Sequence, residues 1–178
     1  MCIRDSVEMG PVIRPESRER IGGLVRTGVD EGARVLVGGD ALDEGEFADG
    51  FFFHPTVLDG VAPDSTLART EVFGPVLSLM HVATLEEAIA LANDRAFGNQ
   101  ACVFTRDGAS ARAFRHGVRA GNVGINLGVA APMAFFPFSG WNDSFFGDLH
   151  AQGRHGIEFY TQTKVVIERW PDGWSRRF

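Results

Sequence analysis

The clearest pattern in the chain lies in residues 76–126, which read VLSLMHVATLEEAIALANDRAFGNQACVFTRDGASARAFRHGVRAGNVGIN. Short apolar runs predict strands at Val76–Val82, Ala101–Thr105 and Asn122–Asn126, and the two stretches between them have helical spacing. Parallel strands need a crossover connection, usually a helix, and such crossovers are right-handed. The pattern therefore predicts an α/β fold built on a parallel sheet.

The two intervening helices have recognisable start signals. Thr84 followed by Glu87 is a capping box, and it precedes an apolar face that ends before Gly98. Asp107 can cap the second helix, which ends by Gly121. The apolar faces consist of Leu85, Ala88, Ile89 and Ala92 in the first helix and of Ala111, Phe114 and Val118 in the second.

The residues before this core predict one more helix and two strands. A helix is expected from about Pro15 to Gly32, since Ile21, Leu24, Val25 and Val29 recur at helical spacing. Arg34–Val37 reads as a short strand and the acidic stretch Asp40–Gly50 as an exposed loop. Phe51–Leu58 reads as a strand, and Pro55 places it at a sheet edge or a bulge.

Residues 132–153, PMAFFPFSGWNDSFFGDLHAQG, have no helical or strand period and read as a shaped loop. The loop contains six large aromatic residues, Phe135, Phe136, Phe138, Trp141, Phe145 and Phe146. Together they represent about 1,000 Å² of apolar surface, more than a soluble monomer usually exposes. We expect the loop to pack on the chain's own sheet, against another chain, or as the wall of a ligand site.

The C-terminal residues predict a helical turn at Arg154–Phe159 and a strand at Tyr160–Trp170, with Val165 and Ile167 on one face. This strand would complete a sheet in a neighbouring subunit or form an edge strand of its own domain.

Composition narrows the function classes. The chain has 178 residues, 44% of them hydrophobic, and a net charge of −6 with scattered arginines, so nucleic acid is not an expected partner. No apolar run reaches the roughly 18 residues of a membrane span. The opening MCIRDS lacks a secretory core, which predicts a cytoplasmic protein. Because MCIRDS fits no pattern in the residues that follow, residues 1–8 are interpreted as a non-native leader.

Few residues indicate chemistry by themselves. Glu71 precedes an apolar strand beside Phe73 and Gly74, where a carboxylate could accept hydrogen bonds from a ribose diol, although a glutamate at such a junction is usually solvated. Cys102 lies mid-strand and is interpreted as a buried structural thiol. His150 and His155 beside the loop could act as bases, but the simpler interpretation gives them no such role. No zinc spacing, P-loop or dinucleotide glycine motif occurs.

The stretch EVFGPVL at 71–77 resembles the nicotinamide-side motif of the aldehyde dehydrogenase superfamily, and AIALANDRAFGNQACVFTRD and RAGNVGIN are similar to its catalytic domain. Most members carry a Pro-Phe-Gly-Gly loop. Here the aromatic loop, followed by GIEFYTQTKVV, resembles the CoA-acylating methylmalonate-semialdehyde dehydrogenase branch. The likeness runs from about Met9 to Trp170.

The resemblance implies an NAD-dependent oxidation of methylmalonate or malonate semialdehyde to propionyl-CoA or acetyl-CoA and CO₂, through a cysteine nucleophile. It implies that Glu71 holds the nicotinamide ribose and that Phe73 flanks the ring. Phe135, Phe136, Phe138 and Trp141 would line the approach of substrate and CoA. Residues 160–170 would serve homo-oligomer assembly.

The same resemblance places the dinucleotide domain and the nucleophilic cysteine before Met9, so no catalytic residue is assigned in this chain and the chain alone is expected to be inactive. The loop also departs from the branch, since Asn142-Asp143 replaces a basic residue and a glycine. The expected organisation is a leader at 1–8, a partial catalytic domain at 9–153 and an assembly strand and tail at 154–178. Two rival hypotheses are an aldehyde dehydrogenase with another acyl acceptor and a non-catalytic assembly partner.

Overall fold

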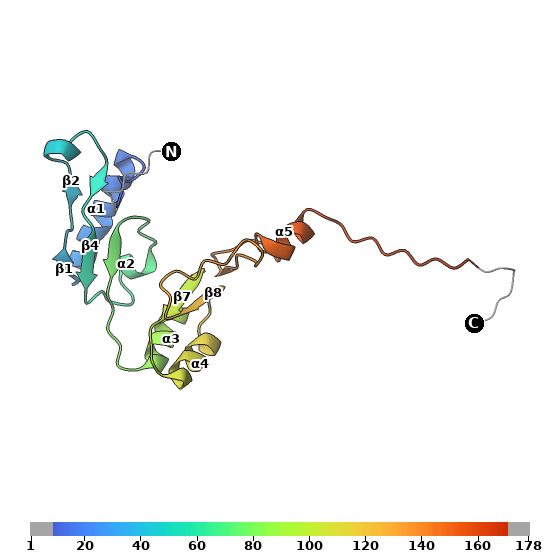
Figure 1. Cartoon of the computed structure of the whole chain (residues 1–178). Helices are drawn as coiled ribbons and strands as arrows, with labels where there is room; N and C mark the ends of the chain where they lie inside the picture. The colour runs from blue at the N-terminus through green and yellow to red at the C-terminus, as the bar shows by residue number, and fades with distance from the viewer. Residues whose placement is uncertain (1–8, 171–178) are drawn as a thin grey trace. The chain divides into compact units, whose positions relative to one another are not determined.

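The computed structural model describes residues 9–170 (Figure 1). The chain divides into two compact units between Leu91 and Ala92. Helix α3 (Leu85–Asn93) lies across this division. None of the described helices is long and apolar enough to cross a membrane.

The first unit begins with helix α1 (Pro15–Asp30), as predicted. Proline suits the first turn because its fixed φ matches the helix and its missing N–H would have no intrahelical partner there. Ile21 and Val25 face the interior with exposed fractions of 0% and 2%, whereas Val29 is exposed. The apolar face of the helix is therefore narrower at its C-terminal end than the spacing predicts.

A three-stranded sheet lies beside α1 in the order β1 (Arg34–Val37), β4 (Thr56–Asp59), β5 (Val76–Ser78). Strand β4 pairs antiparallel with β1 and parallel with β5. The prediction for β1 is confirmed. The single strand predicted at Phe51–Leu58 is wrong, because its pairing breaks at His54-Pro55 and resumes in β4, at the centre of the sheet.

Proline explains this break, since it has no N–H to donate to a neighbouring strand. The first donor after it, the N–H of Thr56, bonds to the carbonyl of Pro75 at 2.8 Å. The other half of the predicted strand, β3 (Phe52–Phe53), pairs with β2 (Ala41–Leu42). The predicted Asp40–Gly50 loop thus contains β2 and a short 3₁₀ helix, Gly45–Phe47.

The core of the first unit joins the helix to the sheet and to the short helix α2 (Thr66–Arg69). Its buried members are Ile21, Val25, Ala33, Phe53, Leu58, Val61 and Leu67. Gly28 allows close approach here, since a Cβ at this position would lie 2.7 Å from Cδ2 of Leu67. Ser65 caps the N-terminus of helix α2, since its side chain accepts the N–H of Ala68.

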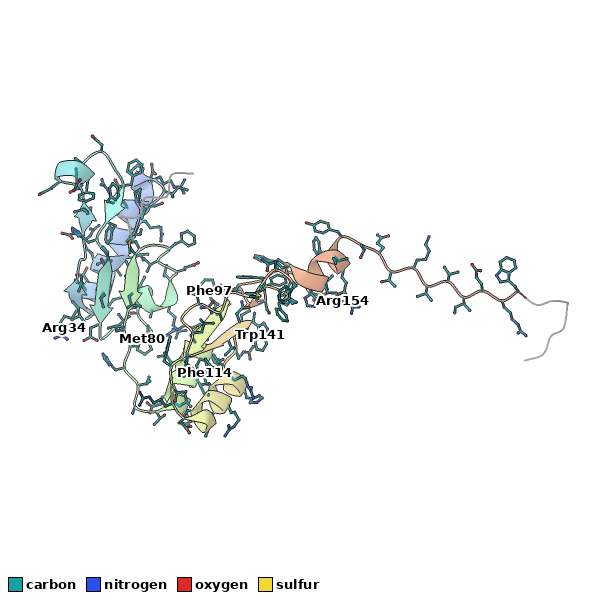
Figure 2. All side chains as sticks on the ribbon, in the orientation of Figure 1. Arg34, Met80, Phe97, Phe114, Trp141 and Arg154 are labelled. Atoms are coloured by element: carbon teal, nitrogen blue, oxygen red, sulfur yellow. The ribbon has the colours of Figure 1, made fainter. Side chains whose placement is uncertain are left out.

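The second unit contains a parallel pair of strands joined by a helix. Strand β7 (Gln100–Val103) pairs with β8 (Asn122–Ile125), and α4 (Gly108–Gly117) connects them. Asp107 caps α4 by accepting the N–H of Ser110 at 2.6 Å, and Phe114 faces inward with 6% exposure (Figure 2). The βαβ unit at residues 100–125 is confirmed.

The predicted sheet nevertheless differs from the structure in one respect. Strand β5 pairs with β4 of the first unit and has no pairing with β7 or β8 among the described strands. Helix α3 still has its predicted start, because Thr84 Oγ1 accepts the N–H of Glu87 at 3.1 Å. Glu87 in turn accepts the N–H of Ala83 at 2.8 Å.

The remaining elements of the second unit are short. Strand β6 (Phe97–Gly98) pairs antiparallel with β9 (Trp141–Asn142), and α5 (Gly153–Phe159) confirms the predicted helical turn. Residues 161–170 have neither helix nor strand in the described structure. The alternative of an edge strand on its own domain is therefore wrong.

We predict that Asp59 makes the first unit sensitive to acid. Its carboxylate lies 2.6 Å from His81 Nε2 and accepts a hydrogen bond from Arg34 at 2.9 Å. These contacts, that of His81 first, lower the pKa of Asp59 below its usual value of 3.8. A lowered carboxylate pKa stabilises the fold above the unfolded-state pKa, and this contribution is lost as pH falls through the folded-state pKa.

Asp59→Asn should therefore lower the urea midpoint at pH 7, and the difference from wild type should shrink below about pH 4. Asp64→Asn, at an exposed position, is the matched control and should leave the midpoint nearly unchanged. A difference for Asp59→Asn that is the same at pH 7 and pH 3 would contradict the linkage.

A second prediction concerns Gly74. A Cβ there would overlap Cδ1 of the fully buried Ile21 and lie 2.9 Å from its Cγ1. Gly74→Ala should cost about 1–3 kcal/mol of unfolding free energy through overpacking, measured by urea denaturation. Gly10→Ala is the control, since no atom lies within 4 Å of a Cβ at Gly10. Equal stability of the two variants would rule out this packing role.

Candidate functional site

The segment Glu71–Phe73 carries the most unusual backbone in the first unit. Phe73 has a φ of 47°, in the left-handed region, and its side chain is 80% exposed. A bulky residue in this region is an outlier that costs of order 1–3 kcal/mol. An exposed ring brings no burial energy to offset that cost. Such strain gathers at functional sites, so the outlier marks this segment as a candidate site.

Helix α1 and strand β4 hold this segment in place. Arg20 Nη2 donates to the carbonyl of Val72 at 2.6 Å, and the next helix residue, Ile21, packs on Gly74. On the C-terminal side, the carbonyl of Pro75 accepts the N–H of Thr56. The turn at Phe73 is thus fixed by neighbours on both sides. Glycine is required at position 74 because a Cβ there would overlap the side chain of Ile21.

Glu71 is exposed, and its carboxylate makes no hydrogen bond or ion pair within residues 9–170. The group is therefore available to a ligand, and its two oxygens suit a pair of vicinal hydroxyls. Phe73, two residues on, offers an exposed aromatic face. The structure brings these two predicted residues together on one anchored segment, while their cofactor roles stay predictions.

The aromatic loop is irregular, as predicted, and its two ends are fastened to each other. The N–H of Phe138 bonds to the carbonyl of Ala151 at 2.7 Å, and that of Gly153 bonds to Ala134 at 3.0 Å. Phe145 is half-buried, whereas the other five rings are largely left exposed by the described part of the chain. The exposed fractions are 67% for Phe135, 57% for Phe136, 40% for Phe138, 48% for Trp141 and 94% for Phe146.

The structure therefore does not show these exposed rings packed on the chain's own sheet. Of the three settings expected for the loop, contact with another chain and the wall of a ligand site remain. The roles predicted for Phe135, Phe136, Phe138 and Trp141 stay predictions.

Two histidines stabilise the interior of the loop. His150 stacks on Phe145 with ring centroids 4.2 Å apart and on His155 at 5.7 Å. Its Nε2 lies 3.1 Å from the carbonyl of Gly140. These contacts give His150 and His155 a structural role in shaping the loop.

Cys102 lies in β7 as predicted, and its side chain is half-buried where the sequence predicted a buried structural thiol. Its Sγ lies 3.5 Å from the carbonyl of Gly128, and Gly124 leaves room for the sulfur. Among the described residues, no group of His, Cys, Asp and Glu side chains could hold a metal ion.

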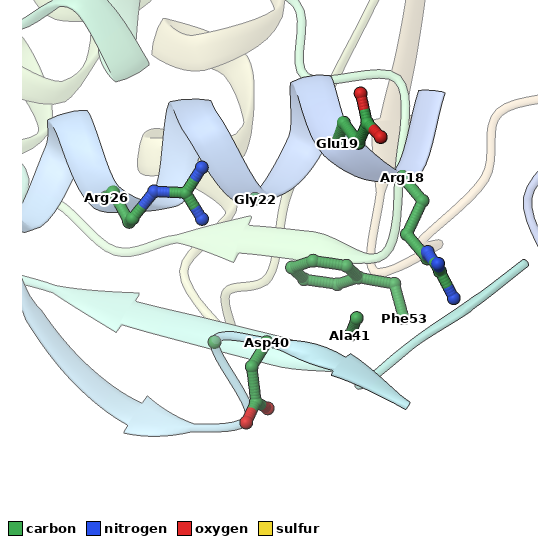
Figure 3. Close-up of a pocket in the computed structure, with 8 residues that line it drawn as sticks. Arg18, Glu19, Gly22, Arg26, Asp40, Ala41 and Phe53 are labelled. Atoms are coloured by element: carbon green, nitrogen blue, oxygen red, sulfur yellow. The ribbon is translucent and has the colours of Figure 1, made fainter. Parts of the chain in front are cut away.

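A hollow of about 460 Å³ lies in the first unit between α1 and the β2–β3 hairpin (Figure 3). The sequence did not predict it. Arg18, Gly22 and Arg26 line it from the helix, and Phe53 lies opposite. These three helix residues are spaced four apart and share one helix face, but the hairpin that forms the opposite side is distant in sequence.

Comparison with known proteins shows which family the chain matches. The sequence profile of the "Aldehyde dehydrogenase family" matches residues 3–166. Malonate-semialdehyde dehydrogenase 1 of Geobacillus thermodenitrificans is 49% identical over 168 residues, which are 94% of this chain and 34% of that protein. The chain therefore spans about a third of the length of the curated relatives that it matches.

Solved structures agree with the sequence match. Methylmalonate-semialdehyde dehydrogenase from Oceanimonas doudoroffii has a TM-score of 0.89 at 40% identity, covering 92% of this chain and 34% of that one. A Sinorhizobium meliloti structure determined in complex with NAD has a TM-score of 0.91 at 38% identity, covering 95% and 34%. The family match and the shared α/β fold show that this chain belongs to the aldehyde dehydrogenase family.

Proposed function

We propose that this chain forms part of an NAD-dependent, CoA-acylating dehydrogenase of malonate or methylmalonate semialdehyde. The observation that carries the proposal is its 49% identity to a malonate-semialdehyde dehydrogenase across 94% of the chain. Because the chain spans about a third of that relative, the activity belongs to the whole protein. The products would be acetyl-CoA or propionyl-CoA and CO₂, made in the cytoplasm.

The segment Glu71–Phe73 suits the nicotinamide end of NAD. Glu71 has an exposed carboxylate with no partner among the described residues, so it can accept both hydroxyls of a ribose. Phe73 presents an exposed ring from a backbone fixed by Arg20 and Ile21, and it can flank a planar nicotinamide. When bound, NAD would supply the hydride acceptor.

The aromatic loop is proposed to line the approach of semialdehyde and CoA, through Phe135, Phe136, Phe138 and Trp141. Exposed rings on a loop with fastened ends can exclude water from a thioester intermediate. The proposed nucleophile is neither Cys2 nor Cys102. Cys102 lies in the β7–β8 pair, and its Sγ contacts the carbonyl of Gly128 at 3.5 Å.

One alternative is an aldehyde dehydrogenase that transfers the acyl group to water. Lactaldehyde dehydrogenase from Escherichia coli has a TM-score of 0.82 at 36% identity, covering 92% of this chain and 33% of that one. The fold thus occurs in relatives named for other aldehydes. The two reactions differ in the released product, which is a CoA thioester in one and a free carboxylic acid in the other.

The C-terminal segment is proposed to pair with a second subunit. Residues 161–170 have no strand partner in the described chain, yet their apolar side chains are exposed (Figure 2). Exposed fractions are 80% for Val165, 92% for Ile167 and 85% for Trp170. A backbone without strand pairing in the described chain and exposed apolar side chains together favour strand addition between chains.

The reaction can be tested with a chimera that joins this chain to the preceding two thirds of the Geobacillus relative. We expect the chimera to form NADH from malonate semialdehyde and to release acetyl-CoA, identified by mass spectrometry, only when CoA is present. Glu71→Gln should raise the KM for NAD about 10–100-fold, since a hydrogen bond to a charged group contributes about 1.5–3 kcal/mol.

Glu44→Gln, in an exposed loop, is the control for Glu71→Gln and should leave the KM for NAD unchanged. The chain alone should form no NADH and should show no saturable NAD binding at micromolar concentrations. Release of a free carboxylic acid in place of the thioester would favour the alternative acyl acceptor.

Assembly can be tested separately by sedimentation at several protein concentrations. The wild-type chain should self-associate, and Ile167→Glu should reduce association, because a buried carboxylate without a partner is costly. Gln162→Glu, on the opposite face of the predicted strand, is the matched control. A wild-type chain that stays monomeric at all concentrations would refute the assembly role.

A further inference from the structure

Three glycines bring the middle of the aromatic loop into backbone contact with strand β6 and with the turn before β8. A Cβ at Gly121 would lie 2.6 Å from both the N and the Cα of Gly140. A Cβ at Gly98 would lie 3.1 Å from the carbonyl oxygen of Trp141. Gly98 and Gly140 are buried. Because glycine has no Cβ, backbone segments can approach this closely here.

Hydrogen bonds join the same three segments. The N–H of Asp143 donates to the carbonyl of Ala96 at 2.9 Å, next to the β6–β9 pairing. The N–H of Gly121 donates to the carbonyl of Gly98 at 2.8 Å. The N–H of Gly98 in turn donates to the hydroxyl of Ser144 at 3.1 Å. The loop, β6 and the start of β8 therefore form one hydrogen-bonded junction.

Asn122, the first residue of β8, ties this junction to the loop through its side chain. Its Nδ2 donates one hydrogen bond to the carbonyl of Asn99 at 3.2 Å and another to the carbonyl of Ser139. An asparagine amide has two N–H donors, and here each meets a carbonyl of a different segment. An aspartate would present only acceptors to these carbonyls, so the amide group is required.

The segment that Asn122 anchors carries two of the rings used in the proposed function. Phe138 directly precedes Ser139, and Trp141 directly follows Gly140. The two rings are 40% and 48% exposed, so packing within the described chain fixes them only in part. The position of these rings therefore depends on the backbone between them, which the Asn122 side chain holds.

We propose that Asn122 is a positioning residue for transfer of the acyl group to CoA, an inference that rests on the function proposed for the aromatic loop. By fixing the carbonyl of Ser139, Asn122 keeps Phe138 and Trp141 along the approach of semialdehyde and CoA. It contacts neither substrate in this role and acts through the loop. Binding of NAD should not depend on it, because Glu71 belongs to the first unit.

The first test compares hydrogen–deuterium exchange of the full chain in its wild-type and Asn122→Asp forms, measured by mass spectrometry. The carboxylate has the same shape as the amide but no N–H donors, so a peptide spanning residues 139–144 should exchange about tenfold faster. A peptide from α4 should keep its rate, since its cap at Asp107 is unchanged.

Asn99→Asp is the matched control for Asn122→Asp. It makes the same chemical change at an exposed neighbour whose side chain has no hydrogen bond within residues 9–170. Both peptides should therefore exchange as in the wild-type chain. This control separates the loss of the two amide donors from the effect of an added negative charge.

The second test uses the chimera with the Geobacillus relative. Asn122→Asp should raise the KM for CoA about tenfold and raise the share of free carboxylic acid among the products. The acyl group then passes from the cysteine sulfur to water instead of to the sulfur of CoA, and the cysteine regains its proton in either case. The KM for NAD should stay unchanged. A merely structural defect would lower kcat through loss of folded enzyme and leave both KM values and the product ratio unchanged.

Gly121→Ala tests the same contact without altering Asn122, because its Cβ would press directly on the backbone of Gly140. It should reproduce the faster exchange at 139–144 and the higher KM for CoA. Gly156→Ala is its control in the same unit, since no atom lies within 4 Å of a Cβ at Gly156.

Two results would overturn the positioning role. One is unchanged exchange at residues 139–144 in both Asn122→Asp and Gly121→Ala, and the other is an unchanged KM for CoA with an unchanged product ratio. A wild-type chimera that releases no acetyl-CoA would instead refute the proposed function itself, and the role in acyl transfer with it. The exchange measurement distinguishes these failures, because it needs no activity.

Discussion

The contact between helix α1 and the segment after Glu71 connects the core of the first unit to its candidate site. Ile21 is fully buried and packs on Gly74, while the neighbouring Arg20 holds the carbonyl of Val72. One turn of helix therefore fixes the backbone on both sides of Phe73. The energy that holds Phe73 at positive φ comes from this packing and from the β4–β5 pairing, not from the exposed ring itself.

The sequence predicted those features whose cause is local. The capping residues Thr84 and Asp107 begin their helices because each bonds to an N–H three residues later. Strand β1 ends before two glycines, and the βαβ unit at residues 100–125 follows from the alternation of periods. In each case the residues that form the feature lie within one short segment, so the sequence of that segment is enough to predict it.

The features that the sequence did not predict depend on distant partners. Strand β5 pairs with β4, and nothing in Val76–Ser78 itself distinguishes that partner from β7. Pro55 indicated an edge or bulge, but its carbonyl-side neighbour Thr56 begins the central strand. Glu71 was noted from its position before an apolar strand, and the family resemblance added Phe73 and the cofactor roles. The positive φ of Phe73 depends on the packing of α1 against this segment, which the local sequence does not show.

The aromatic loop and the C-terminal segment share one property, which is exposed apolar side chains. Phe146 and Ile167 are each more than 90% exposed, and burying such a side chain contributes about 1.5–3 kcal/mol. Four such residues would together contribute about 6–12 kcal/mol on burial, which is comparable with a typical domain's whole net stability of about 5–15 kcal/mol. Covering either surface with further apolar residues would therefore stabilise the fold. In the aromatic loop such a cover would order mainly the rings, because the N–H groups of Phe138 and Gly153 already fasten the two ends of its backbone to each other.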